Sequence, residues 1–358
     1  MVTRPQEEET YSGQVEVGKC QEQKYLGFIL SSSGDNMVNI RSIRNKSIGI
    51  IKKIFTKLNS LKLQKYYFEC GLIFMNVMLR SSILYGCETY YFLKENEMRQ
   101  IERIEESFMR QLLKTTKGCP INQMYLELGQ IPARFDIVKL RLFFLKYILC
   151  QEKSSLINQV FNQQVDKPTK NDWASTCSIN LKELNIEMTF KQIEEMPITK
   201  FNEMVRQKCK ESAYNYLMKR RGSKGAEIVY TRIQMSEYLL PNDEFNIENQ
   251  RNLFSIRNRM VNIPSNFVNK ENNHFQCLCG EKEDMKHIYD CIYLNSEEPE
   301  ENFENLFCGN IHIQSKVFKR FEYNLNSREE YNDLNENESD HEILCDPPYS
   351  SLLELGNG

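Results

Sequence analysis

Hydrophobic residues in the first part of the chain follow two different periods. The run Lys24–Leu30 is rich in β-forming residues and precedes the turn-forming sequence Ser31–Asp35, which predicts a short strand entering a tight turn. From Ile40 onward, apolar residues recur three or four positions apart, as they do on one face of a helix. The residues predicted to face inward are Ile40, Ile43, Ser47, Ile50, Ile54, Leu58 and Leu61.

Three more helices are predicted before residue 151. The first spans about Leu63–Leu84 and ends before Gly86, because glycine commonly terminates a helix. Its predicted apolar residues are Tyr67, Cys70, Phe74, Val77, Met78 and Leu84. The second spans Glu95–Lys114, and the third spans Phe135–Cys150 after the break at Pro132. Residues 151–240 are more polar and are predicted to be helical in part.

These patterns predict a mainly α protein, in which a helical bundle follows a short β-hairpin. With 358 residues, of which 41% are hydrophobic, the chain is long enough for more than one hydrophobic core. No apolar run approaches the roughly 18–20 residues of a membrane span, and the polar start lacks the apolar stretch of a secretory signal. We therefore expect a nuclear or cytoplasmic protein whose twelve cysteines are thiols or metal ligands.

Charge is distributed unevenly along the sequence. Residues 24–150 contain 20 Lys and Arg against 10 Asp and Glu, a net charge of +10. Residues 297–358 contain 4 against 15, a net charge of −11, and are predicted to form a disordered acidic tail. The basic block is what a phosphate-binding surface requires, although solvated helix faces would produce the same excess.

A cluster of cysteine and histidine residues carries the most specific chemistry. Cys277, Cys279, His287 and Cys291 fall within 15 residues, and their thiolate and imidazole groups are preferred zinc ligands. His287 and Cys291 are four positions apart and therefore share one face of a helical turn. Four such ligands fill a tetrahedral shell, so the predicted site is structural. His274 is an alternative ligand, and buried thiols beside a surface histidine are the alternative interpretation.

Several segments resemble, in order, the C-terminal part of the reverse transcriptases of non-LTR (LINE-type, jockey-like) retrotransposons. Lys24–Gly27 with Ser33–Asp35 resembles the primer-grip hairpin, and Ile83–Tyr90 (ILYGCETY) resembles the family's LLYGCETW signature in the thumb, with Tyr90 replacing Trp. Arg103–Leu113 resembles the helix that follows, and the Cys/His cluster resembles the C-terminal Cys-Cys-His-Cys knuckle.

The resemblance divides the chain into segments. They are a polar N-terminal segment (1–23), a primer-grip-like hairpin (24–39), a thumb-like helical domain (40–150), a helical connector domain (151–270), a zinc-knuckle-like module (271–296) and the acidic tail (297–358). The family's catalytic aspartates would lie before Lys24, and the chain contains no Asp-Asp dipeptide. We therefore expect no polymerase activity from the chain alone. Mg²⁺ would be a cofactor only if a separate chain supplied a palm domain.

Two functions of different classes follow. The first is a non-catalytic, truncated reverse transcriptase fragment that binds RNA or an RNA–DNA duplex, with zinc as a structural cofactor. Its predicted phosphate-binding residues are Arg41, Arg44, Lys52, Lys53, Lys57, Arg99, Arg103 and Arg110. The last three are weaker candidates because acidic residues near them on the same helix could neutralise them. The second function is a helical protein-interaction scaffold or retroelement relic, with exposed tyrosines near residues 66 and 90.

Overall fold

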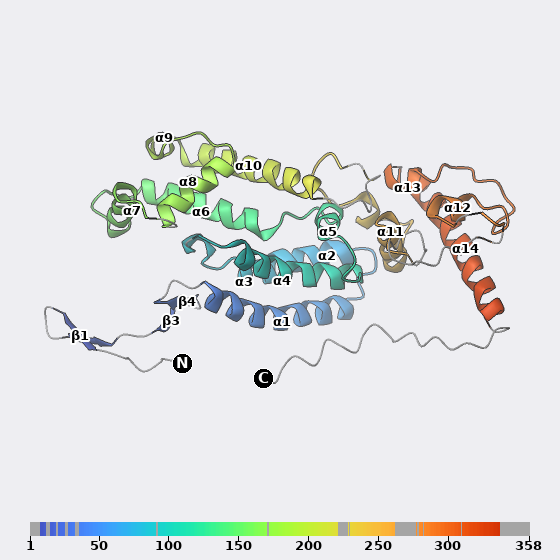
Figure 1. Ribbon diagram of the computed structural model, residues 1–358, viewed down its shortest axis with the longest axis horizontal. Helices are drawn as coiled ribbons and strands as arrows, with labels where there is room; N and C mark the ends of the chain where they lie inside the picture. The colour runs from blue at the N-terminus through green and yellow to red at the C-terminus, as the bar shows by residue number, and fades with distance from the viewer. Residues whose placement is uncertain are drawn as a thin grey trace. The chain divides into compact units, whose positions relative to one another are not determined.

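The computed structural model is mainly helical, as predicted (Figure 1). It describes residues 8–11, 15–18, 21–25, 28–32, 36–90, 92–169, 172–220, 228, 230–261, 277, 279–281, 283–308 and 310–336. The chain divides into two compact units, residues 1–261 and 262–358. Each unit is described by itself.

Two short antiparallel hairpins precede the helices. Their strands are β1 (Glu8–Tyr11) with β2 (Val15–Gly18), and β3 (Glu22–Tyr25) with β4 (Phe28–Ser31). Tyr25 pairs with Phe28, so the chain reverses direction between these two residues. The prediction of a single strand over Lys24–Leu30 is therefore wrong, because its β-forming residues are divided between two strands. Of the turn expected at Ser31–Asp35, Ser31 is the last residue of β4, and residues 33–35 lie outside the described residues.

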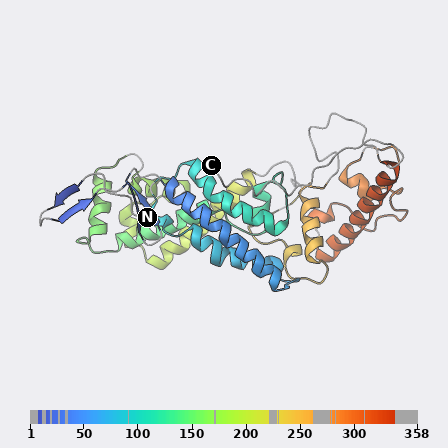
Figure 2. The ribbon, with the colours of Figure 1, turned by 90° about the horizontal axis from the view of Figure 1, so that it is seen from below.

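Helices of the first unit stack in successive layers. They are α1 (Met37–Ser60), α2 (Tyr67–Phe74), the π-helix η1 (Met75–Arg80), α3 (Ser81–Ile83), α4 (Glu95–Leu113), α5 (Ile121–Glu127), α6 (Ala133–Leu149), α7 (Leu156–Asp166), α8 (Trp173–Glu183), α9 (Phe190–Glu195), α10 (Ile198–Lys219) and α11 (Ile247–Arg257), with 3₁₀ turns η2 (Cys87–Thr89) and η3 (Glu237–Leu239). Helix α1 packs on α4, α4 on α6, and α6 on α10. Figure 2 shows α1 in front of the other helices of this unit.

The predicted helices α1 and α4 are both present: α4 ends one residue earlier than predicted, and α1 begins three residues before Ile40. In α1 the buried residues are Asn39, Ile40, Ile43, Ser47, Ile51, Ile54 and Leu58. Ile51 therefore replaces the predicted Ile50 on the inner face, and Leu61 lies exposed after the helix ends. The amphipathic pattern predicted the orientation of this helix with an error of one position.

The helix predicted over Leu63–Leu84 begins later, at Tyr67, and has a different inner face. Its middle turn is the π-helix η1, which contains an extra residue per turn and rotates the following side chains. Met75 and Leu79 are consequently buried, whereas the predicted inward residues Val77 and Met78 are 66% and 38% exposed. The regular period assumed from the sequence fails at this point.

The motif Ile83–Tyr90 forms a partly buried junction between the second hairpin and the helices, with Ile83, Cys87 and Tyr90 buried. Tyr90 contacts the Phe28 ring at a centroid distance of 5.4 Å, and the Asn39 side-chain amide donates a 2.7 Å hydrogen bond to the Tyr90 hydroxyl. Gly86 has a φ of +72°, and a β-carbon there would lie 2.7 Å from the Phe28 ring. Glycine is required at this turn for both reasons.

A second core joins α6 to the helices that follow it. Leu142 and Leu145 of α6 pack in one cluster with Trp173, Phe201 and Val205. The Trp173 indole N–H donates to the Glu88 carbonyl at 2.8 Å, and its side chain is buried. Residues 40–150 and 151–261 therefore belong to one compact unit.

The second unit contains α12 (Met285–Asp290), α13 (Asn305–Cys308) and α14 (Ile311–Glu336). Helix α14 packs on α12 and buries Val317, Phe318 and Phe321. The prediction that the whole tail from residue 297 is disordered is thus wrong for the helical residues 305–308 and 311–336. The acidic composition concealed apolar residues at helical spacing. Residues 337–358 lie outside the described residues.

None of the helices in the described part of the chain is both long and apolar enough to cross a membrane.

Candidate metal centre and cationic surfaces

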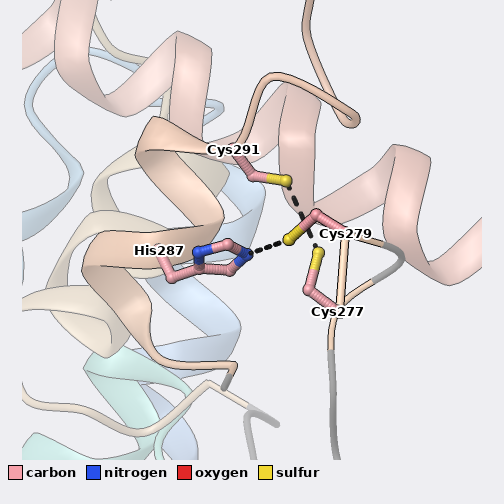
Figure 3. Close-up of side chains that lie close together, drawn as sticks. All are labelled: Cys277, Cys279, His287 and Cys291. Carbon is pink, nitrogen blue, oxygen red and sulfur yellow. Dashed lines mark hydrogen bonds between the residues drawn. The ribbon is translucent and has the colours of Figure 1, made fainter. Parts of the chain in front are cut away.

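The structure brings the predicted Cys/His cluster (Cys277, Cys279, His287 and Cys291) together in the second unit (Figure 3). Its four ligand atoms all lie within 4.8 Å of one another, close enough to bind one metal ion. The Cys277 and Cys291 Sγ atoms are 3.5 Å apart, and the Cys279 Sγ is 3.2 Å from His287 Nε2. These four residues match the predicted metal ligands; His274 lies outside the described residues.

Local backbone structure places the four ligands. The Gly280 N–H donates to the Cys277 carbonyl at 2.8 Å, and Gly280 has a φ of +86°, so the chain turns tightly after Cys279. On the other side, Asp284 caps α12 by accepting a 2.8 Å hydrogen bond from the His287 backbone N–H. This cap fixes the first turn of α12, from which His287 projects, and Cys291 follows its last residue.

Helix α14 holds the end of α12 in place. The Asn324 side-chain amide donates to the carbonyls of Ile288 and Tyr289 at 2.8 and 3.1 Å, and Arg320 Nε also donates to the Tyr289 carbonyl, at 3.0 Å. These carbonyls lie in the last turn of α12, two and three residues before Cys291. The sequence analysis missed both supporting residues. Only the helical spacing of the apolar residues in α14 could have indicated this element.

Burial opposes ionisation of the Cys277 thiol in the absence of an ion. Burial, together with the neighbouring Cys291 thiol, raises the pKa of Cys277 to about 12. A divalent cation among the four ligand atoms would favour the thiolates, so metal binding there would release protons. Burial therefore disfavours a free Cys277 thiolate, whereas the four ligand atoms together could bind a thiophilic cation.

The outer face of α1 forms the first cationic surface. The helix contains six basic and no acidic residues. We call the six together the α1 cationic face: Arg41, Arg44, Lys46, Lys52, Lys53 and Lys57, all of them exposed. Among the described residues none of the six forms an ion pair. The structure thus places all five α1 candidates in solvent and adds Lys46 to them.

The basic residues of α4 are not equivalent. Arg110 is partly buried, binds Glu106 at 2.7 Å and donates to the carbonyls of Thr116 and Cys119. The N–H groups of its guanidinium are therefore engaged by the fold and are less available to phosphates. Arg99 and Arg103 are exposed and form no ion pair with a described residue.

The acidic residues expected to neutralise Arg99 and Arg103 bind other arginines. Glu95 and Glu102 bind Arg134 of α6 at 3.0 and 2.5 Å, and Glu105 binds Arg80 at 2.7 Å. Burial alone would lower the pKa of Arg134, but its hydrogen bonds to Glu102 and Glu95 outweigh burial and raise it. These carboxylates are consequently not available to neutralise the exposed arginines of α4.

Comparison with known proteins adds no further identification. No family model matches the chain, and no curated protein and no solved structure matches it.

Proposed function

We propose that the chain binds the phosphate backbone of RNA or an RNA–DNA duplex through the α1 cationic face. The observation that supports this is a 24-residue helix whose exposed positions carry six cations and which has no acidic residue. Such an array releases condensed counterions when it neutralises phosphates, which gives affinity without base specificity.

The α1 cationic face contains two pairs of basic residues, and each pair forms a row along the helix. Arg41 and Lys52 are 11 residues apart, as are Lys46 and Lys57, so each row extends about 16 Å along the helix. Rows of this length fit several successive phosphates, whereas a single small anion would engage only one or two side chains. An extended polyanion is therefore the favoured ligand.

The resemblance to non-LTR reverse transcriptases supports the same proposal, because their thumb helices contact a template–primer duplex. In that interpretation the chain is the downstream part of such a polymerase and acts without catalysis of its own. Polymerisation would require a second chain that supplies the palm and its Mg²⁺ ligands.

We also propose that the ion in the Cys/His cluster is Zn²⁺. Three thiolates and one imidazole match its preferred ligands, and Zn–S bonds of about 2.3 Å imply sulfur–sulfur distances of about 3.8 Å in a tetrahedron. The 3.5 Å between Cys277 and Cys291 is close to that value. With four protein ligands the ion stabilises the second unit and leaves no position for a substrate.

Fluorescence anisotropy with a labelled RNA–DNA hybrid at graded KCl concentrations tests the nucleic-acid proposal. Removing three charges in Arg41→Ala/Arg44→Ala/Lys52→Ala should reduce the slope of log K against log salt by about 2–3. The control Lys191→Ala/Lys200→Ala/Lys210→Ala removes three exposed charges elsewhere in the same unit and should leave the slope unchanged. The proposal would be overturned if the wild-type chain did not bind the hybrid even at low salt, roughly 20–50 mM.

A protein-interaction scaffold is the second candidate, supported by exposed apolar residues on α2 and η1. Ile73 is 52% exposed and lies one turn before Val77. The four tyrosines expected to be exposed are Tyr66, Tyr67, Tyr90 and Tyr91. Tyr66 is exposed, but the expectation is wrong for Tyr67 and Tyr90, which are buried, and Tyr91 lies outside the described residues. Sedimentation distinguishes the candidates: self-association abolished by Ile73→Ser/Val77→Ser, without nucleic-acid affinity, would favour the scaffold.

A further inference from the structure

A second cationic surface lies at the end of α10, which packs on α5 and α6. Arg220 follows α10 and is exposed, with its guanidinium carbon 4.4 Å from the centre of the Tyr216 ring. Its Nη1 donates a 2.9 Å hydrogen bond to the Tyr216 hydroxyl. The Asn122 side-chain amide donates to the Arg220 carbonyl at 2.7 Å. Backbone and side chain of Arg220 are thus both held by the fold.

The Tyr216 ring connects Arg220 to α4 through Arg134. The Arg134 guanidinium carbon lies 4.6 Å from the centre of the same ring, and Arg134 also binds Glu95 and Glu102 of α4. Arg99 is four residues after Glu95 and three before Glu102, so it lies on the same side of α4 as both. Arg99 and Arg220 therefore belong to one edge of the unit.

The electrostatics of Glu95 agree with this placement. The hydrogen bond from Arg134 lowers the pKa of Glu95, and the charges of Arg220 and Arg99 lower it further. Both guanidinium groups are thus within electrostatic range of one carboxylate, which Arg134 already engages.

This edge is separate from the α1 cationic face. Phe108 of α4 packs on Phe55 of α1 at a ring-centroid distance of 5.2 Å, whereas Glu95 and Glu102 point to Arg134 of α6. Arg99 therefore lies on the α6 side of α4. A ligand bound only along α1 would leave it unoccupied.

We propose that the α4–α10 edge, formed by Arg99, Arg103 and Arg220, binds a second stretch of the nucleic-acid backbone that α1 binds. Arg103 lies one turn beyond Arg99, with β-carbons about 5–6 Å apart, so the two side chains can reach neighbouring phosphates. Planar guanidinium groups bind phosphate oxygens in pairs, which a lysine ammonium cannot reproduce. The inference rests on the proposed function of α1.

The anisotropy titration with the RNA–DNA hybrid tests the edge independently of α1. We expect Arg99→Ala/Arg103→Ala/Arg220→Ala to reduce the salt slope by about 2–3, as the α1 variant does. The charge-preserving Arg99→Lys/Arg103→Lys/Arg220→Lys should keep the slope and lose affinity, because only paired phosphate contacts are removed. The control is Lys191→Ala/Lys200→Ala/Lys210→Ala, and thermal melts monitored by circular dichroism verify folding.

The outcomes separate the two proposals. If the α1 variant weakens binding while the edge variant matches the control, the edge inference is wrong and the proposed function remains. If the wild-type chain does not bind the hybrid, both are wrong. If the edge variant loses affinity for poly-L-glutamate but not for the hybrid, the edge binds an acidic protein, which also overturns the inference.

Discussion

Replacing Arg80 with methionine should destabilise the first unit strongly. Arg80 is partly buried, with 12% of its side chain exposed, and it pairs with Glu105, whose side chain has no exposed surface. Arg80 Nε donates to Glu105 at 2.7 Å, and the same guanidinium donates to the Ile131 carbonyl and to Asp136. Methionine keeps the approximate length and apolar stem of Arg80, but it removes the cation from a buried carboxylate.

The size of the effect follows from what Glu105 retains. The Tyr125 hydroxyl and the Ala133 backbone N–H still donate to Glu105, at 2.8 and 3.0 Å. Removing one partner of a buried ion pair typically costs about 3–5 kcal/mol, and the two remaining donors favour the lower value. A loss of about 3 kcal/mol is a large fraction of the roughly 5–15 kcal/mol that stabilises a typical domain.

Urea denaturation followed by far-ultraviolet circular dichroism measures this loss. Burial raises the pKa of Glu105 although Arg80 lowers it, and removing Arg80 should raise it further. The folded state of the variant then binds a proton more tightly than the unfolded state does. Its deficit should therefore shrink as the pH falls toward the raised pKa.

Two variants make the test specific. Arg103→Met removes an exposed charge from α4 and should change the free energy of unfolding by no more than about 0.5 kcal/mol. Arg80→Met/Glu105→Gln removes the uncompensated charge and should recover part of the loss. If Arg80→Met cost no more than Arg103→Met, the claim that this ion pair supports the fold would be refuted.

Four further outcomes are expected. Tyr90→Phe should cost about 1–3 kcal/mol in urea denaturation, because the buried Asn39 amide loses its acceptor. Gly86→Ala should lower the free energy of unfolding by about 1–3 kcal/mol because alanine is strained in the left-handed backbone conformation. The clash of the new methyl group with the Phe28 ring should add to this loss. Cys279→Ser should lower the zinc content measured by mass spectrometry, whereas Cys150→Ser, at an exposed thiol remote in sequence from the cluster, should not. Lys286→Ala should leave the salt slope of nucleic-acid binding unchanged, because its ammonium group pairs with Glu304.

Strongly amphipathic helices were predictable from the sequence. Helices α1 and α4 extend close to their expected limits because apolar residues recur on one side and charges on the other. Helix α14 was missed because its composition suggested disorder, although Val317, Phe318 and Phe321 follow a helical period. Composition describes a whole segment, whereas burial depends on a few positions.

The ligands of the candidate metal centre were predictable for a different reason. Cysteine and histidine are few, and their close spacing limits how a short segment can fold around them. The residues that support the centre come from α14, more than 30 positions away from the atoms they bind. Local spacing contains no information about such contacts.

Charge pairing within α4 shows where local rules fail. Residues three or four apart on a helix are neighbours, so the sequence suggested that Glu95 and Glu102 would neutralise Arg99. Only the Glu106–Arg110 pair forms within the helix as that rule expects. Arg134 and Arg80, from other helices, bind the remaining carboxylates from partly buried positions, where ion pairs are less screened than at the surface. Tertiary contacts therefore decide which arginines of α4 stay exposed.

The two units differ in how many of their basic side chains are paired within the fold. In the second unit Lys286, Lys316 and Arg328 pair with Glu304, Glu300 and Glu283, and Arg320 donates to backbone carbonyls. These four cations are engaged within their own unit, and residues 297–358 carry a net charge of −11. A phosphate backbone would be repelled there and attracted to α1 and the α4–α10 edge. This difference agrees with the proposal that the first unit binds the polyanion, and with a metal ion in the Cys/His cluster that serves only to fold the second unit.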